Sequence, residues 1–238
     1  MIYQYSRTGT YHIQNGQNNQ DVILTKETKR FSAAVLADGV SSCSKAAEGA
    51  AIAAKALIEL LMDSGEFFFG FDSKKTTDFI LSRVLFELNK TAQKSGNDAA
   101  EYSSTLCSVI FDKTTRKLLY FSLGDSMITA TGSKGFEILA APYEDNGTGC
   151  CTTTTENASA AVKTAVINAE EYDSVLLLSD GAWANLFCKG SLSGNVRDMI
   201  VRQDMPALAA YIENLGGQDD NSFIAMELTP GISKITEL

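Results

Sequence analysis

Aspartates stand at the ends of apolar segments in five places along the chain. Asp38, Asp125 and Asp180 each close an apolar run, whereas Asp21 and Asp220 each open one. In an antiparallel sheet, the end of one strand lies beside the start of its neighbour. We therefore expect all five carboxylates to meet at one edge of the sheets.

Such a cluster needs a counter-charge, because two carboxylates within about 4 Å repel by roughly 1 kcal/mol in water and about 4 kcal/mol at an effective dielectric constant of about 20. The chain has one histidine and no C-x-x-C spacing, so the available ligands are oxygen atoms. Oxygen ligands suit Mg²⁺, Mn²⁺ or Ca²⁺. Gly39, Gly124 and Gly181 flank three of the aspartates and let the backbone approach a metal closely. A single Asp-Gly pair is more often a plain turn, but five aspartates at strand ends indicate a metal site.

The pattern of apolar residues predicts one domain over residues 1–238, in which helices stand between two runs of strands. The predicted strands are short apolar runs bounded by turns: 21–25, 31–38, 104–112, 116–125, 126–132, 136–141, 161–168, 172–179 and 221–228. The predicted helices carry apolar residues at helical spacing: 45–62 with Ser44 as N-cap, 76–94, 182–188 and 193–215 with a break before Pro206. Residues 142–160 lack periodicity and predict a mobile loop. This order indicates an α+β layered fold.

Composition and charge limit the possible functions. The chain of 238 residues is 45% hydrophobic and 21% charged, as in ordinary globular proteins, and its formal net charge is -9. That charge argues against sequence-independent binding of nucleic acid or of an anionic membrane. No run approaches the roughly 18 apolar residues of a membrane span, and the first residues do not resemble a signal peptide. The cysteine count of five is odd, so we expect reduced thiols, a cytoplasmic location and a monomer.

Six segments follow one another along almost the whole chain: NNQD (18–21), LADGVSS (36–42), SSTLCSVIFD (103–112), LLYFSLGDS (118–126), DSVLLLSDGAW (173–183) and QDDNSFIAMEL (218–228). In this order they resemble the motifs of the PPM family, the metal-dependent type 2C Ser/Thr protein phosphatases. The opening YHIQNGQNNQD is similar to a bacterial subgroup of that family. The resemblance implies a four-layer αββα sandwich, with two central antiparallel β-sheets flanked by helices.

The resemblance also implies a site for two Mn²⁺ or Mg²⁺ ions and a weaker third ion. By position, Asp38 corresponds to the acid that bridges two metals, and Gly39 provides a backbone carbonyl. Asp180 and Asp220 match the other main metal ligands.

Two further aspartates match acids of the same cluster. Asp21 corresponds to the N-terminal acid, which reaches the metals partly through water, and Gln20 stands where many members carry glutamate. Asp125 matches the acid that helps to hold the third metal. Asp219 is a near miss, which we place outside the direct ligands.

The implied reaction is hydrolysis of phosphoserine and phosphothreonine in proteins by a metal-bridging water, with Asp38 and Asp180 as catalytic residues. Two cations about 3.5 to 4 Å apart lower the pKa of such a water, so no protein nucleophile is needed. The arginine that the family usually places before the first motif aspartate corresponds here to Gly16. We predict that Arg7 takes its place and that His12 contacts substrate phosphate. A packing role for His12 in a first hairpin is the alternative.

Two classes of function remain at this point. The first is a phosphatase that acts on phosphorylated proteins and opposes a Ser/Thr kinase. The second is a module of the same fold that binds partners or metal without turnover, which the missing arginine permits. The intact set of acids favours the enzyme, because buried carboxylates are costly to retain without a cation. A receiver-type or haloacid-dehalogenase phosphotransfer domain fits less well, since it requires alternating strands and helices.

Overall fold

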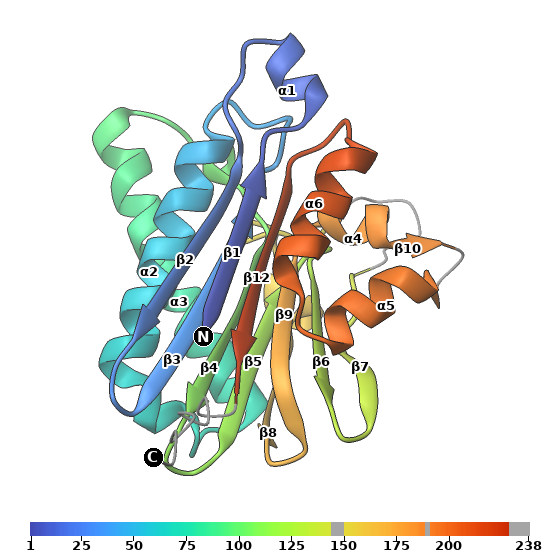
Figure 1. Ribbon diagram of the computed structural model, residues 1–238. Helices are drawn as coiled ribbons and strands as arrows, with labels where there is room; N and C mark the ends of the chain where they lie inside the picture. The colour runs from blue at the N-terminus through green and yellow to red at the C-terminus, as the bar shows by residue number, and fades with distance from the viewer. Residues whose placement is uncertain (144–149, 189–190, 229–238) are drawn as a thin grey trace.

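Two antiparallel β-sheets lie face to face in the computed structural model, which describes residues 1–143, 150–188 and 191–228 (Figure 1). The strands of the first sheet are, in spatial order, β2 (Asp21–Glu27), β3 (Phe31–Asp38), β4 (Leu106–Asp112), β5 (Lys117–Leu123) and β8 (Lys163–Asn168). The strands of the second are β1 (Ile2–Arg7), β12 (Asn221–Glu227), β9 (Tyr172–Leu178), β6 (Met127–Gly132) and β7 (Gly135–Ala140).

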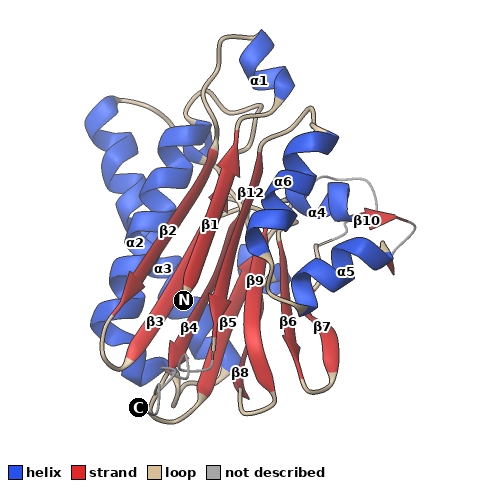
Figure 2. Ribbon diagram, viewed as in Figure 1, coloured by secondary structure: helices blue, strands red, loops and turns tan. Residues whose placement is uncertain are grey.

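Helices cover the outer face of each sheet (Figure 2). The helices on the first sheet are α2 (Ala46–Phe68) and α3 (Ser73–Ser95), and those on the second are α4 (Asp180–Leu186), α5 (Gly194–Val201) and α6 (Met205–Leu215). The remaining elements are short: α1 (Thr10–Gln14), the 3₁₀ helices η1 (Ala99–Tyr102) and η2 (Ala158–Ala161), and the strand pair β10 (Phe187–Cys188) and β11 (Ser191–Leu192). The predicted α+β class and the four-layer αββα sandwich are confirmed.

Strand β9 shows why its sequence is a continuous apolar run. Its odd-numbered residues Val175 and Leu177 face the other sheet, and its even-numbered residues Leu176 and Leu178 face the helices. Successive side chains of a strand point to opposite faces, so a strand that is covered on both sides is apolar at every position. The molecule therefore has three hydrophobic layers, one between the sheets and one under each layer of helices.

The ends of the central strands converge on one edge of the sandwich. In the β2–β3 hairpin, Asp21 lies directly opposite Asp38. Leu178, at the end of β9, pairs with Phe223 of β12 on one side and with Met127 of β6 on the other. The aspartates that follow β9 and precede β6 and β12 are thereby brought to neighbouring strand ends, as the alternation of apolar runs and aspartates predicts.

The predicted break before Pro206 is confirmed: residues 193–215 form α5 and α6, and the chain turns between them at Gln203, whose φ is 56°. Other details of the predicted elements were wrong. Helix α2 begins at Ala46 with Lys45 at the N-cap position and has no side-chain cap, so Ser44, the predicted N-cap, lies one residue too early; its N–H donates to Glu101. Strand β1 and helix α1 were not foreseen, and β1 pairs with β12 instead of forming a hairpin with the following residues.

Part of the predicted 142–160 loop is held in place by hydroxyl groups; residues 144–149 lie outside the described residues. The Thr152 hydroxyl is 2.6 Å from that of Ser103, and the Thr153 N–H donates to the Ser104 carbonyl at 2.9 Å. Threonine side chains thus fasten this segment to the residues that precede β4.

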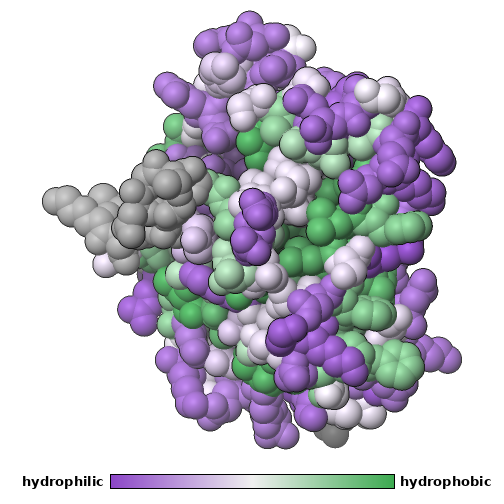
Figure 3. Space-filling model, turned by 180° about the vertical axis from the view of Figure 1, so that it is seen from behind, coloured by the Kyte–Doolittle hydropathy of each residue, from purple (hydrophilic) through white to green (hydrophobic). Residues whose placement is uncertain are grey.

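The surface of the α2–α3 layer exposes aromatic side chains. Phe67, Phe79 and Phe86 are each about half exposed or more. Viewed from behind, hydrophobic residues lie scattered among hydrophilic ones (Figure 3).

None of the helices in the described ranges is both long and apolar enough to span a bilayer. The cysteines whose side chains are described are free thiols: Cys43, Cys107, Cys150 and Cys151.

We predict that Leu36→Ala destabilises the protein strongly. Leu36 is fully buried between the sheets, two residues before Asp38, so its loss leaves a cavity and should lower the free energy of unfolding by about 2–5 kcal/mol. Leu215→Ala at the end of α6 is the matched control, because that side chain is 50% exposed; it should change stability by less than about 0.5 kcal/mol. Urea denaturation measures both, and equal effects would contradict the assignment of the inter-sheet core.

Candidate active site

The acid pair Asp21 and Asp38 is held by the β2–β3 register and by the chain just before β4. The Asp38 N–H donates to the Thr105 hydroxyl at 3.2 Å, and the Thr105 N–H donates to the Asp38 carbonyl at 2.8 Å. The Gly39 N–H donates to the Gln20 carbonyl at 3.2 Å. Both backbones around the pair are therefore fixed, and the two carboxyl groups lie at the same end of the hairpin.

Asp180 begins helix α4, and glycine is required beside it. The Gly181 N–H donates to the Asp180 carboxylate at 2.6 Å. A Cβ atom at Gly181 would lie 2.1 Å from the Asp220 carbonyl oxygen, a distance at which backbone atoms clash. Glycine thus lets the start of α4 approach Asp220 closely. The Asp180 carboxyl group lies close to that of Asp38, and each influences the pKa of the other.

Asp220 is almost completely buried, at 2% exposed, and its carboxylate joins three segments of the chain. It accepts hydrogen bonds from the Gly9 N–H at 2.7 Å and from the Gln20 N–H at 2.6 Å. The Nδ1 atom of His12, also 2% exposed, lies 3.0 Å from the same carboxylate without hydrogen-bond alignment. The Nε2 atom of His12 has no hydrogen-bond partner. Asp220 therefore ties the β1–α1 connection to the start of β2.

Asp125 lies between β5 and β6, and its position is set by a tryptophan. The Trp183 indole N–H donates to the Asp125 carbonyl at 2.7 Å, which links this turn to α4. The preceding Gly124 has a φ of 108°, a conformation that side chains rarely adopt. One carboxylate oxygen of Asp125 is buried and has no hydrogen-bond partner, while the Cys150 thiol lies beside the group.

Burial and mutual repulsion keep protons on this cluster when no cation is bound. Burial, with the neighbouring Asp220 and Asp180, raises the pKa of Asp21 to about 8. Burial, with Asp21 and Asp180 nearby, raises the pKa of Asp38 well above its usual value. Burial and the charges of Asp125 and Asp219 raise the pKa of Asp180 to about 6. Burial also raises the pKa of Asp125.

The donor set fits hard divalent cations. Both carboxylate oxygens of Asp21 and one of Asp125 are buried without a hydrogen-bond partner, and the Ser179 and Ser222 hydroxyls near Asp21 do not complete a normal hydrogen bond. Buried carboxylate oxygens without partners are costly unless a proton or a cation satisfies them. Within the described part of the chain, no three His, Cys, Asp or Glu side chains already form a closed metal cage. The site is therefore a set of convergent oxygen donors that a cation would draw together.

Arg7 is engaged elsewhere in this structure. Its guanidinium donates to the Glu213 carbonyl at 2.8 Å, and its Nε lies 3.6 Å from the Glu213 carboxylate, near the end of α6. Its backbone pairs with Asn221, next to Asp220, so the residue stands near the cluster while its side chain points to α6. Gly16, in the place of the family's arginine, lies on an exposed turn with a φ of 66°. The substrate-binding roles of Arg7 and His12 stay predictions.

Several residues that hold the acids in place lie in the sequence motifs, but the sequence did not predict these roles. Thr105 and Ser104 belong to the third motif, but their hydrogen bonds to Asp38 and to the 152–153 segment join positions far apart in the chain. Trp183 was expected only as part of the core, and its indole bond to Asp125 could not be read from spacing. Gln20 has a buried amide oxygen without a partner, which adds a neutral oxygen beside the acids.

Residues 8–215 match the family described as Protein phosphatase 2C. The chain belongs to this family. Among curated proteins, a search finds no significant match.

Solved structures, two of them of bacterial serine/threonine phosphatases, share the fold of this protein phosphatase 2C chain. The serine/threonine phosphatase Stp1 from Staphylococcus aureus is 14% identical, with a TM-score of 0.69 over 97% of this chain and 95% of that one. The serine/threonine phosphatase of S. agalactiae is 16% identical, with a TM-score of 0.69 over 94% of this chain and 98% of that one. RsbX, solved in complex with magnesium, is 16% identical, with a TM-score of 0.60 over 96% and 94%.

We predict that the metal-free protein loses stability as the pH rises from about 5 to about 8. An unfolded aspartate has a pKa of about 3.9, whereas burial raises the pKa of Asp21 to about 8 in the folded chain. The folded state therefore holds more protons than the unfolded state in this window, and stability falls by roughly 1.4 kcal/mol per pH unit for each such group.

Thermal unfolding in EDTA across this pH range measures the slope. Mn²⁺ should flatten it, and Asp21→Asn should reduce it because an amide does not titrate. A flat profile for the metal-free wild type would contradict the raised pKa values.

Proposed function

We propose that this chain is a Mg²⁺- or Mn²⁺-dependent phosphatase that hydrolyses phosphoserine and phosphothreonine in proteins. The observation that carries the proposal is the convergence of Asp21, Asp38, Asp125 and Asp180 at one sheet edge, with three buried carboxylate oxygens that have no partner. Membership of the protein phosphatase 2C family supports this reaction over other uses of a cation site. The substrates would be phosphorylated proteins, so the chain would oppose a Ser/Thr kinase.

The proposed metal ligands are the aspartates of the cluster and one backbone carbonyl. Asp38, the Gly39 carbonyl, Asp180 and Asp220 would hold two cations, with Asp21 beside them. Asp125 would contribute to a third, weaker site. When bound, the cations would supply charge neutralisation for the phosphoryl oxygens and activation of water for in-line attack.

The chain itself provides order and limits solvent access. Backbone N–H donors from Gly9 and Gln20 fix the direction of the Asp220 carboxylate. The Asp38 and Asp180 carboxyl groups lie close together at the strand ends, so a divalent cation would meet oxygens from both. Preorganisation of this kind lowers the energy of reorganisation during the reaction.

A second candidate function is a module that binds metal or a partner without turnover. It is favoured by the phosphate-binding side, where Gly16 replaces the family's arginine and Arg7 is bonded to Glu213. Hydrolysis of phosphate esters separates the two functions, because only the enzyme performs it.

We expect hydrolysis of p-nitrophenyl phosphate and of a phosphothreonine peptide to require added Mn²⁺ or Mg²⁺. Asp38→Asn and Asp180→Asn should each abolish it, since each removes a charge on which metal binding depends. Asp63→Asn on the exposed face of α2 is the matched control and should keep wild-type activity. Calorimetric titration with Mn²⁺ checks metal binding, and circular dichroism checks the fold. Full activity in excess EDTA would overturn the proposal, and metal binding without any hydrolysis would select the second candidate.

We also predict that Arg7→Ala raises KM for a phosphothreonine peptide by more than tenfold at unchanged metal affinity. A charge-assisted hydrogen bond contributes about 1.5–3 kcal/mol, and arginine binds two phosphoryl oxygens where lysine acts as a point charge. Arg7→Lys should therefore rescue KM only in part.

Glu213→Gln tests whether Arg7 must leave Glu213 to bind phosphate. It weakens the hold on Arg7 and should lower KM slightly. An unchanged KM together with a lower melting temperature in Arg7→Ala would restrict Arg7 to joining β1 and α6.

A further inference from the structure

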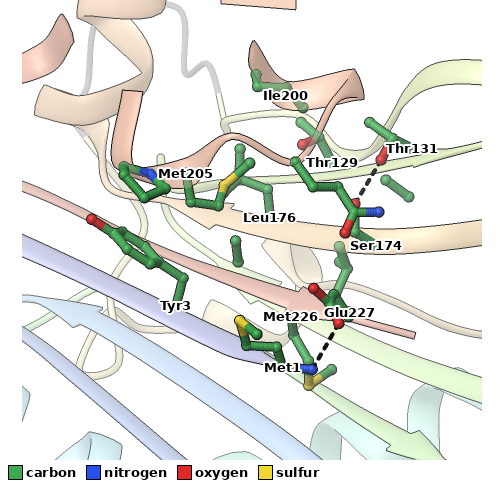
Figure 4. Close-up of a pocket in the computed structure, with 15 residues that line it drawn as sticks. Met1, Tyr3, Thr129, Thr131, Ser174, Leu176, Ile200, Met205, Met226 and Glu227 are labelled. Carbon is green, nitrogen blue, oxygen red and sulfur yellow. Dashed lines mark hydrogen bonds and ion pairs between the residues drawn. The ribbon is translucent and has the colours of Figure 1, made fainter. Parts of the chain in front are cut away.

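A pocket lies on the outer face of the second sheet, under the turn between α5 and α6 (Figure 4). Its volume is about 120 Å³. The floor is formed by β6, β9 and β12, and the roof by the end of α5 and the start of α6. Each strand of the floor also leads to one acid of the cluster: Thr129 is four residues from Asp125, Leu176 four from Asp180, and Ala225 five from Asp220. Four or five residues of a strand span roughly 13–17 Å. The pocket is therefore separate from the acids, although the same three strands carry both.

Most of the pocket wall is apolar. Leu176, Ile200 and Met205 point into it from the sheet and the two helices (Figure 4). The Tyr3 ring forms another side and is itself stacked on Phe223 with ring centroids 5.8 Å apart. A wall of this composition favours an apolar body and gains little from a strongly hydrated one.

The floor also carries three hydroxyl groups, and one of them is unsatisfied. In the β6–β9 register, Thr131 lies opposite Ser174, and their hydroxyl oxygens are 2.6 Å apart. Thr129 lies opposite Leu176, which offers no polar atom. The Thr129 side chain is 0% exposed, and its Oγ1 has no hydrogen-bond partner. A buried hydroxyl without a partner costs about 1–3 kcal/mol, so a ligand hydroxyl that reached this atom would recover that free energy.

The charges around the pocket do not suit an ionic ligand. Of the residues that line it, Glu227 alone has a charged side chain, and its carboxylate pairs with the Met1 ammonium group at 3.0 Å. No lysine or arginine lines the pocket to receive an anion. The side chain of Gln203, from the turn with positive φ, adds a neutral amide.

We propose that this pocket binds a small, neutral, mainly apolar molecule with one hydroxyl group, of the phenol or short-chain alcohol class. The ligand hydroxyl exchanges a hydrogen bond with Thr129 Oγ1, and its apolar body packs on Leu176, Ile200 and Met205. The pocket volume of about 120 Å³ is of the same order as the apolar cavity of about 150 Å³ that binds benzene. This binding is independent of phosphate-ester hydrolysis and does not involve the carboxylate cluster.

The test uses phenol as the probe and toluene as its matched partner without a hydroxyl group. In two-dimensional ¹H–¹⁵N NMR titrations, phenol should shift the amide signals of β6, β9 and the α5–α6 turn, and it should bind at least about tenfold more tightly than toluene, or about 1.4 kcal/mol. Thr129→Val keeps the side-chain shape and removes the hydroxyl. It should abolish the preference for phenol and leave toluene binding unchanged.

Two further variants locate the site. Thr76→Val replaces a buried threonine of α3 on the other side of the molecule and should leave both titrations unchanged. Ala225→Ile adds volume on the pocket floor and should weaken phenol and toluene alike, with circular dichroism as the check on the fold. Phenol that shifts signals elsewhere, or that binds no better than toluene, would overturn the proposal. So would a preference for phenol that survives in Thr129→Val.

Discussion

Like charges held at one buried edge are the constraint on which this structure depends. Asp21 faces Asp38 directly across the β2–β3 pair, and Asp180, Asp125 and Asp220 lie at neighbouring strand ends. Carboxylates that are packed together at a buried, low-dielectric edge repel one another by several kcal/mol. The fold must therefore supply hydrogen bonds, protons or cations to them. It supplies them unequally. The Asp220 carboxylate receives backbone N–H donors, whereas the Asp21 carboxylate receives none, and burial raises the pKa of Asp21 to about 8.

This inequality divides the cluster into a fixed part and an adaptable part. The bonds from Gly9 and Gln20 give Asp220 one direction, and the close contact between Gly181 and the Asp220 backbone sets the start of α4 against it. Asp21, Asp38 and Asp180 have pKa values raised by burial and by one another's charges. The second sheet, through Asp220, thus provides the reference against which the acids of the first sheet are placed.

The features that could be predicted from the sequence are those that depend on local pattern. The β2–β3 hairpin is marked by two apolar runs around a charged turn, and its register alone brings Asp21 to Asp38. Strand β1 was missed because its sequence, IYQYSR, mixes polar and aromatic residues and is completed only by pairing with β12. Helix α1 has five residues and no side-chain cap, so no local signal marks it.

Side-chain destinations were harder to predict than strand positions. Arg7 was assigned to phosphate by its charge, but its guanidinium reaches Glu213, 206 positions away, and spacing contains no information about that bond. The same holds for the Trp183 indole at Asp125 and for the hydroxyl groups that fasten residues 152–153. These contacts are decided by the packing of layers, which a single sequence does not reveal.

The pairing of β1 with β12 has a consequence for the order in which the protein is made. Ile2 faces Met226, so β1 is synthesised long before the strand with which it forms its hydrogen bonds. Closing so long a loop costs chain entropy before any contact compensates for it, and such pairings form slowly. Asp220, which opens β12, receives its bonds from Gly9 and Gln20 only after this closure. A chain in which β12 has not yet formed therefore carries Asp21 and Asp38 without Asp220, and the cluster of acids is complete only when this strand closes the sheet.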